Sequence, residues 1–307
     1  MILKDTIFFS QANLLLDVLP FIDHDHRFAL KGGTAINFFI RPLPRISVDI
    51  DLAYLPLEDR DQTMNNINNA LIKLAEKIQS GLARVRIDYR MSSDTNLIIG
   101  LMVNLDQVRI KIEPNLVTRG SVFPVVDVRM VKQAEDFFEK SVKVQSLSLA
   151  DLYGGKLCAA LDRQHPRDLF DVHLLFENEG ITEEIRQAFI VYLISHNRPM
   201  IELLNPNEID IDRTYELEFQ GMTFENITLS DLKAARTKLF KAMKKILTEK
   251  ERHFLISIKS GLPEWDLFPI KHVKNLPAIQ WKLHNLTRMD KRKHQDALKR
   301  LKEYLES

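Results

Sequence analysis

The sequence FALKGGTAINFFIRPLPRISVDIDL, residues 28–52, decides the fold of this chain. Its last part, residues 46–52, alternates apolar and polar side chains with the period of two that indicates a half-buried β-strand. Asp49 and Asp51 therefore point to the same face of that strand, with their Cα atoms about 6.5–7 Å apart. Two carboxylates on one face repel each other unless a cation or a proton lies between them. The segment thus predicts a metal site, and Mg²⁺ suits it because this ion takes oxygen ligands and is often shared with substrate phosphates.

A pair of glycines precedes this strand. Gly32 and Gly33 follow a short apolar strand candidate and permit a tight turn with close backbone approach. Thr34 can cap the helix-like segment that comes next. A helix that begins after such a turn presents free N–H groups to an anion. The same glycines also fit an ordinary strand-to-helix turn, and the nearby pair Asp49 and Asp51 favours the anion-binding interpretation.

Three strand-like runs follow a long helix predicted over residues 59–79. In the last run, residues 107–113, polar and apolar residues alternate, and Pro114 is expected to end the strand. Glu113 supplies a third carboxylate to the metal site if this strand lies beside the strand of Asp49. Taken alone, a glutamate at this position is more often a solvated residue at a strand end than a metal ligand.

The composition predicts two domains and a reduced thiol. The chain has 307 residues, 45% of them hydrophobic, which is enough for more than one core. The formal net charge is +1, so any surface for nucleic acid must be a local patch. The single cysteine, Cys158, excludes a disulfide framework and a cysteine-based zinc site, and its apolar helical surroundings are typical of an inert core thiol. No run approaches the roughly 18 apolar residues of a membrane helix, so we expect a cytoplasmic protein without a membrane partner.

A second acidic pair follows in the helical half of the chain. Lys156 lies part-way along an apolar helical run, and Asp168 and Asp171 share one face of the next helix because they are three positions apart. In isolation, Asp168 fits a residue that stabilises the helix N-terminus. Asp171 fits a solvated side chain or a partner of Arg167.

The remaining segments predict connections and a basic tail. Residues 125–146 mix strand and helix signals and are expected to link two lobes, and residues 215–219 alternate like a short strand. The tail, residues 271–302, holds ten Lys or Arg residues against two Asp. This excess, with Trp281 inside it, suits a nucleic-acid backbone, although a run of charge is usually only a solvated helix face.

The order of these motifs resembles nucleotidyltransferases of the polymerase-β type, which carry a glycine-rich turn, a helix, a DxD strand and a third acidic strand residue. Together with Lys156, the pair Asp168 and Asp171, and the late segment LPAIQWKL at residues 276–283, it resembles the AbiEii/AbiGii-type toxins of bacterial toxin–antitoxin and phage-abortive systems. The resemblance covers most of the chain, about residues 25–290.

This resemblance implies an α+β fold. A nucleotidyltransferase-type mixed sheet flanked by helices would occupy residues 1–146. A mainly helical C-terminal lobe, residues 147–307, would follow and contribute to the active site and to RNA binding. The family implies an enzyme that uses an NTP and Mg²⁺, and some members add nucleotides to the 3′ end of tRNA. A cognate antitoxin is the expected protein partner.

The resemblance also implies roles for particular residues. By position, catalytic roles fall to Asp49, Asp51, Lys156 and Asp168, and metal binding to Asp49, Asp51 and, as a looser match, Glu113. Nucleotide binding falls to Gly32, Gly33, Thr34, Ser47, Lys156 and Asp171. The glycine turn departs from the plain Gly-Ser of other nucleotidyltransferases, so the resemblance does not specify its triphosphate contacts.

Two other classes of protein remain open. A regulatory module would keep the fold and bind nucleotide without transfer, but an idle site need not keep uncompensated carboxylates together. A metal-dependent nuclease or phosphatase can also carry DxD. However, the sequence after Asp51 lacks the Thr or Val of haloacid-type phosphatases, and Lys111-x-Glu113 reverses the Glu-x-Lys order of many nucleases. A transferase lengthens RNA, a nuclease shortens it, and a binding module does neither.

Overall fold

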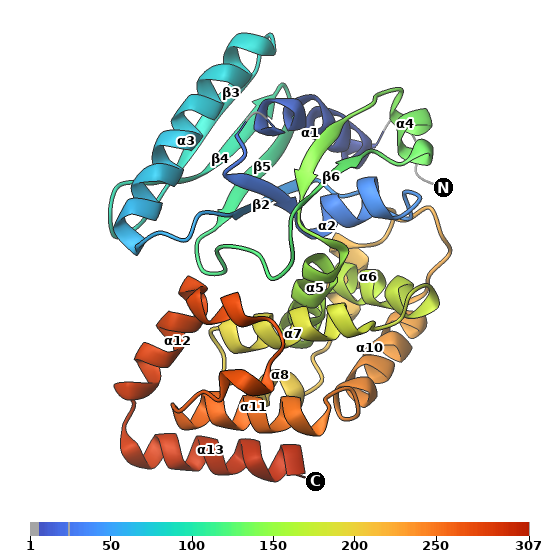
Figure 1. The fold of residues 1–307 in the computed structure, drawn as a ribbon. Coiled ribbons are helices and arrows are strands. Elements are labelled where there is room, and N and C mark those ends of the chain that lie inside the picture. The colour runs from blue at the N-terminus through green and yellow to red at the C-terminus, as the bar shows by residue number, and fades with distance from the viewer. Residues whose placement is uncertain (1–5, 24, 307) are drawn as a thin grey trace. The chain divides into compact units, whose positions relative to one another are not determined.

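The computed structural model describes residues 6–23 and 25–306, which form two compact units. Unit 1 comprises Met1–Leu152 and Phe219–Ile227, and unit 2 comprises Tyr153–Glu218 and Thr228–Ser307. Unit 1 contains a mixed sheet with helices, whereas the described elements of unit 2 are all helical (Figure 1). The expected α+β class is therefore confirmed.

Unit 1 is built on a seven-stranded sheet in the order β3-β4-β5-β2-β1-β7-β6. Its strands are β1 (Phe28–Lys31), β2 (Asp49–Tyr54), β3 (Arg86–Met91), β4 (Ile98–Leu105), β5 (Val108–Asn115), β6 (Val126–Arg129) and β7 (Lys143–Ser146). The central strand β2 runs antiparallel to β1 and parallel to β5. Asp51 is paired in register with Glu113, so the strand of Glu113 does lie beside that of Asp49.

Burial follows the alternation predicted for β2. Ile50 and Leu52 are fully buried, whereas Asp49 and Asp51 are partly exposed. The apolar residues of β5 are buried in the same alternating way. Each strand thus contributes one face to the core and presents its charged residues on the other.

Helices cover the sheet of unit 1. They are α1 (Ile7–Asp23), α2 (Gly32–Ala35), which continues as the π-helix η1 (Ile36–Ile40), α3 (Arg60–Gly81) and α4 (Lys132–Phe138), followed by the start of α5 (Leu149–Arg163). α1 packs on β5 and β7, α3 packs on β4, and the two helices contact each other, so they cover one face of the sheet. α3 begins at Arg60 because the carboxylate of Asp59 accepts the backbone N–H of Gln62 at 2.8 Å.

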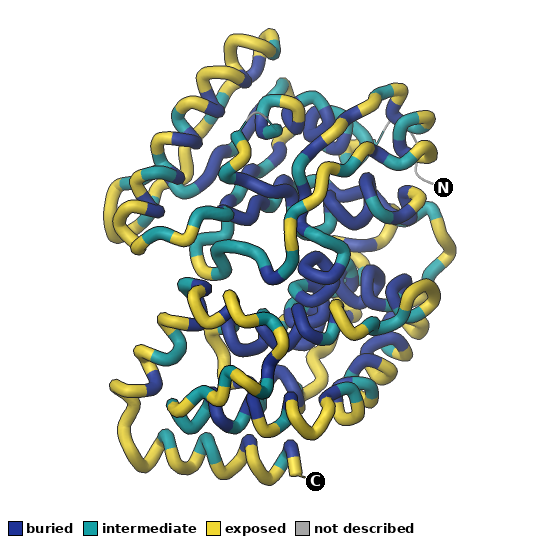
Figure 2. Tube along the Cα trace, viewed as in Figure 1, coloured by how far each residue is buried: buried dark blue, intermediate teal, exposed yellow. Residues whose placement is uncertain are grey.

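Unit 2 is a set of packed helices. After α5 they are α6 (Pro166–Glu177), α7 (Glu183–Ser195), α8 (Met200–Leu204), α9 (Asp212–Glu218), α10 (Leu229–Met243), α11 (Glu249–Ser260), η2 (Trp265–Leu267), η3 (Lys271–Asn275), α12 (Pro277–Thr287) and α13 (Lys291–Glu306). α6 packs on α10, α7 on α12, and α11 on α13. Most of α7 is buried, whereas α13 is largely exposed (Figure 2). Across the described ranges, none of the helices has the length and apolar character needed to cross a membrane.

Two expectations about where elements end are wrong. Residues 6–19 have apolar positions at helical spacing, and Pro20 is expected to end this run. Instead, α1 continues through Pro20 to Asp23, because Leu19 and Ile22 keep burying apolar surface. β5 continues through Pro114, which pairs with β2. The register pairs between β5 and β4 have already ended there, so the missing N–H of proline removes no bond on that side.

Two expectations about connecting segments are also wrong. Residues 125–146 do not form a link, because β7 pairs with β1 and β6 pairs with β7, which extends the sheet. Residues 215–219 are not a strand, since α9 covers most of them and none of its residues is buried. The alternation of polar and apolar residues there has no strand partner, so the local helix prevails.

Candidate active site

The glycine turn lies directly against the carboxylate strand. Gly32 has a φ of +74°, and a Cβ on it would lie 2.5 Å from Oδ2 of Asp51. A Cβ on Gly33 would lie 2.6 Å from Nη2 of Arg45 and 3.1 Å from Oγ of Ser47. Side chains of β2 and of the residues just before it thus occupy the space that a side chain at either glycine would need. The turn therefore packs closely against this strand, which leaves little room for a side chain at either glycine.

Thr34 does not cap the helix as expected, because α2 begins two residues earlier, at Gly32. The hydroxyl of Thr34 lies 2.6 Å from the carbonyl oxygen of Asp49 and 3.0 Å from Oγ of Ser47. Thr34 and Ser47 are both buried. Thr34 therefore connects the glycine turn to the start of β2 by hydrogen bonds, and it orients the hydroxyl of Ser47.

Glu113 lies beside Asp51, but its carboxylate is already engaged. Arg90 forms an ion pair with Oε1, and Nζ of Lys111 lies 2.6 Å from Oε2. Asp51, Glu113, Arg90 and Lys31 all line an open pocket of about 240 Å³. Glu113 is thus neither a simple solvated strand end nor, in this state, an available third carboxylate.

The donor chemistry of this face fits a divalent metal ion held by two carboxylates. Among the described residues, no group of three or more His, Cys, Asp or Glu side chains is gathered as a metal site. Asp49 and Asp51 lie on one strand face, and Mg²⁺ is commonly bound by one or two carboxylates together with substrate phosphates. Both oxygens of Glu113 are paired with cationic side chains. Glu113 can therefore become a third metal ligand only when one of these cations releases it.

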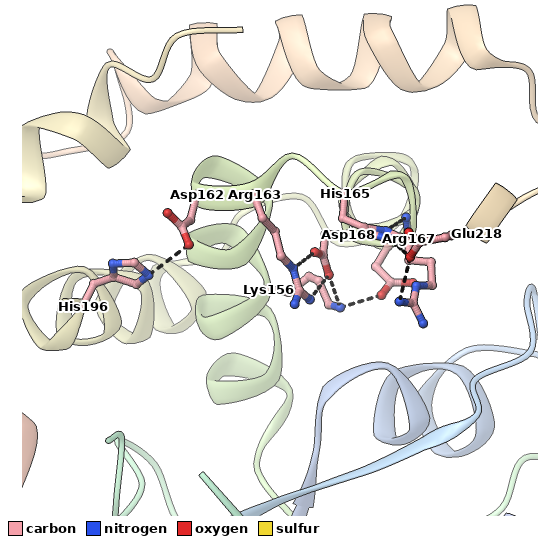
Figure 3. A network of polar contacts seen from close by, with 9 residues as sticks. Lys156, Asp162, Arg163, His165, Arg167, Asp168, His196 and Glu218 are labelled. Carbon is pink, nitrogen blue, oxygen red and sulfur yellow. Dashed lines mark hydrogen bonds and ion pairs between the residues drawn. The ribbon is translucent and has the colours of Figure 1, made fainter. Parts of the chain in front are cut away.

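A second ionic cluster is buried in unit 2 (Figure 3). Nζ of Lys156 on α5 lies 2.8 Å from Oδ1 of Asp168 and 2.9 Å from Oδ2 of Asp171, both on α6. The three side chains are only 7%, 1% and 0% exposed. Nε of Arg163 adds a contact of 2.5 Å to Oδ2 of Asp168. Buried charges of this kind must be paired, and here each has a partner.

The charges around Asp168 control its ionisation. Burial raises the pKa of Asp168, but the charge of Lys156 and the hydrogen bond from Arg163 outweigh burial and hold the pKa well below its usual range. Asp168 is therefore ionised at neutral pH. The side chain of His165, which accepts the N–H of Arg167 at 3.1 Å, caps α6 in its place.

The sequence left two interpretations of Asp171 open. The solvated one is wrong, because Asp171 is fully buried and pairs with Lys156. Cys158 is buried as expected, and burial raises the pKa of its thiol, which confirms the inert core thiol.

The structure brings the sequence-derived residues together as two groups. Unit 1 gathers the glycine turn, Ser47, Asp49, Asp51 and Glu113, and unit 2 gathers Lys156, Asp168 and Asp171. Three arginines of these groups were missed: Arg45, Arg90 and Arg163. Arg163 had a readable signal, since it lies seven positions after Lys156 on the same helix face. The buried Arg45 and the cross-strand Arg90 had none, because only the fold reveals their neighbours.

Comparisons with known proteins identify the family and the fold of this chain. The model of the family described as "Nucleotidyl transferase AbiEii toxin, Type IV TA system" matches residues 13–285. Among solved structures, the chain is similar to MenT4, a nucleotidyltransferase toxin from Mycobacterium tuberculosis H37Rv. That similarity has a TM-score of 0.63 at 13% identity and covers 91% of this chain and 93% of that one, which shows a shared fold. No curated protein sequence matches this chain.

Proposed function

We propose a specific reaction for this chain, which belongs to the AbiEii nucleotidyl transferase toxin family of type IV toxin–antitoxin systems: it joins a nucleoside monophosphate from an NTP to the 3′ end of tRNA, with Mg²⁺. The family establishes the enzyme class, and the acceptor and the metal are our proposal. The observation that carries it is the fit of Gly32 and Gly33 against Asp51 and Ser47, which joins an anion-binding turn to a carboxylate face.

In this reaction a hydroxyl oxygen of the acceptor bonds to the α-phosphorus of the NTP, and the bond to pyrophosphate breaks. Negative charge concentrates on phosphoryl oxygens, so catalysis depends mainly on positioning and electrostatics. The residues of the site must therefore hold phosphate oxygens and compensate their charge.

Asp49 and Asp51 hold the metal in this proposal, and Glu113 adds a third carboxylate when its cationic partners are exchanged. A metal ion held by these carboxylates would supply positive charge that compensates the charge of the phosphate oxygens. The two aspartates are suited to this because they lie on one face of β2, and Asp51 lines the open pocket.

The glycine turn and Ser47 would bind the triphosphate. Backbone N–H groups of Gly32 and Gly33 and the hydroxyl of Ser47 are suitable donors to phosphate oxygens. We assign Thr34 to nucleotide binding only through Ser47, because its own hydroxyl contacts the carbonyl of Asp49.

The buried cluster of unit 2 contributes one lysine to the proposed reaction. Lys156 is the residue we assign to phosphate oxygens, as a compact point charge. Asp168 and Asp171 hold its ammonium group from two sides, so they are positioning residues for Lys156. We propose that activity requires Lys156.

The C-terminal helices offer a surface for RNA. Trp281 is 59% exposed, and its ring stacks on that of His284 with a centroid distance of 5.7 Å. The exposed cations of α13 are Lys291, Arg292, Lys293, Lys299, Arg300 and Lys302. Exposed aromatic rings and basic side chains together suit a nucleic-acid strand. RNA and NTP place the proposed reaction in the cytoplasm, where a cognate antitoxin would restrain it.

The test is transfer of labelled nucleotide. The purified chain is incubated with total bacterial tRNA, Mg²⁺ and each labelled NTP separately, beside the double variant Asp49→Ala/Asp51→Ala. Asp106→Ala is the matched control, because this exposed carboxylate lies in the turn between β4 and β5. We expect label on tRNA with the unmodified chain and with Asp106→Ala, and none with the double variant.

Other outcomes would correct the proposal. Full transfer by a folded double variant would exclude the carboxylates as the catalytic site. Shortened RNA would indicate a nuclease instead. Binding of NTP without labelled tRNA would exclude tRNA as the acceptor, and labelled protein in the same samples would then identify a protein acceptor.

A further inference from the structure

A row of charged side chains crosses the sheet of unit 1 beside the carboxylate pair. The register pairs Lys31 of β1 with Asp51 of β2, and Asp51 with Glu113 of β5. Arg90 of β3 completes the row through its ion pair with Glu113. We call these four residues the charged row. All four line the same open pocket, so the two carboxylates lie between two cations.

A glycine makes the contact between Arg90 and Glu113 possible. β4 lies between β3 and β5, and Gly100 is the residue of β4 that pairs with Arg90. A Cβ on Gly100 would lie 3.6 Å from Cγ of Glu113 and 3.7 Å from Cβ of Arg90. Because Gly100 has no side chain, Arg90 can reach across β4 to the carboxylate.

The ion pair is poorly suited to a purely structural role. The side chain of Arg90 is 55% exposed and that of Glu113 is 22% exposed, and exposed ion pairs contribute little to stability. Arg90 also lies on β3, which is the edge strand of the sheet. Its long side chain is therefore free to take another anionic partner in the pocket without disturbing the core.

The pair competes directly with metal binding. A divalent ion that takes Glu113 as its third carboxylate needs one of the two oxygens, and Arg90 occupies one of them. Lys111 holds the other oxygen but does not line the pocket. Arg90 is thus the partner of Glu113 that an incoming triphosphate meets.

We propose that Arg90 is an exchangeable counter-ion of Glu113 that makes metal binding depend on nucleotide. Without nucleotide, Arg90 occupies the third carboxylate and weakens metal binding at Asp49 and Asp51. When a triphosphate enters the pocket, its negative charge draws Arg90 away, and Glu113 becomes a metal ligand. This inference rests on the proposed function, and it adds a positioning residue that acts through Glu113.

The test measures Mn²⁺ binding to the full chain without nucleotide, from the electron paramagnetic resonance signal of free Mn²⁺. Asp51→Asn identifies the site, since it should weaken the binding. Arg90→Gln should tighten Mn²⁺ binding about three- to fivefold, which is the range expected for loss of one exposed ion pair. Arg86→Gln is the matched control, because Arg86 is an exposed arginine on the same face of β3, about 13 Å away. It should leave Mn²⁺ binding unchanged.

A double variant separates the proposed exchange from simple charge repulsion. In a Glu113→Gln background, Arg90→Gln should no longer tighten Mn²⁺ binding, because the carboxylate to be released is gone. A non-hydrolysable NTP should tighten Mn²⁺ binding in the unmodified chain more than in Arg90→Gln, because coupling between two ligands is reciprocal.

Three results would overturn the inference. The first is unchanged Mn²⁺ binding in Arg90→Gln. The second is that Arg90→Gln tightens Mn²⁺ binding equally in the Glu113→Gln background. The third is that a non-hydrolysable NTP tightens Mn²⁺ binding in Arg90→Gln as much as in the unmodified chain. If transfer to tRNA succeeds in these cases, only the role of Arg90 is refuted. If Asp51→Asn changes neither Mn²⁺ binding nor transfer, the proposed function fails with it. Equal melting temperatures of Arg90→Gln and Arg86→Gln would confirm that folding is not the cause.

Discussion

The molecule carries two pairs of acidic residues that look alike in sequence and differ in structure. Asp49 and Asp51 share a strand face and are partly exposed, and Asp51 lines an open pocket. Asp168 and Asp171 share a helix face, are fully buried, and hold Lys156 between them. The strand pair is thus within reach of a cation in the pocket, whereas the helix pair is closed off from solvent around Lys156.

Because of this difference, substitutions in the two pairs should have different effects on the stability of the fold. A buried carboxylate that disappears leaves a buried ammonium group without compensation, which weakens the fold. Loss of the partly exposed Asp51 leaves no buried charge without compensation, so it should affect chemistry more than stability.

The largest expected effect is on stability, for Asp171→Ala. Removing this carboxylate leaves Lys156 with one partner fewer in a site that excludes water, so we expect a loss of about 3–5 kcal/mol in the free energy of unfolding. Urea unfolding of both chains measures it, with Asp51→Ala as the matched change on the strand face. An equal loss for Asp51→Ala would remove the contrast between the two pairs.

The next effect is on catalysis, for Asp51→Asn. This change keeps the shape that packs against Gly32 and removes the charge. Transfer should fall at least about a hundredfold, which corresponds to about 2.7 kcal/mol of the activation barrier. The urea midpoint should stay at that of the unmodified chain. Retained transfer in initial-rate assays would show that the exposed pair is not the one that carries the chemistry.

A smaller effect is expected for Gly33→Ala. The new Cβ would lie 2.6 Å from the guanidinium of Arg45, and overpacking of this kind costs about 1–3 kcal/mol. The KM for NTP should rise as well, because the turn must shift away from Ser47. The matched control is Gly155→Ala in α5, where the nearest atom would be 3.7 Å away and a helical alanine is favoured. A stable Gly33→Ala chain with unchanged KM would argue against the turn as a phosphate site.

The smallest effect is the pH dependence of the buried pair. The pKa of Asp168 in the folded chain lies below its unfolded value of about 3.9. Its contribution to stability is therefore fully present above about pH 4 and is lost as the pH falls toward the folded pKa. The slope can reach about 1.4 kcal/mol per pH unit for one proton. Urea unfolding between pH 7 and pH 3 should show a shallower loss for Asp168→Asn, and identical slopes would contradict the assignment.

The central part of the sheet could be predicted because its sequence pattern is local. Alternation in β2 and β5 fixed which side chains share a face, and the placement of Glu113 beside Asp51 needed only one correct strand pairing. The joining of β7 to β1 was missed because one strand pair formed across more than 100 residues leaves no local pattern.

The sites show the same division between local and distant information. The shared face of Asp168 and Asp171 follows from helix periodicity, but their common partner Lys156 lies on another helix. Arg90 reaches Glu113 across Gly100 of the strand between them. Such contacts depend on register and packing, which the spacing of residues along the chain does not encode.

The division of unit 1 into two stretches of sequence bears on how the protein is made. Met222 accepts the N–H of Ile46 at 2.8 Å, and the N–H of Phe224 reaches the carbonyl of Pro44 at 2.9 Å. The approach to the carboxylate strand is therefore completed by residues translated almost 180 positions later. At about 5–20 residues per second, a ribosome needs roughly ten to forty seconds to cover that distance. During this interval, the nascent chain lacks part of the support of its carboxylate strand, so its synthesis includes a built-in delay.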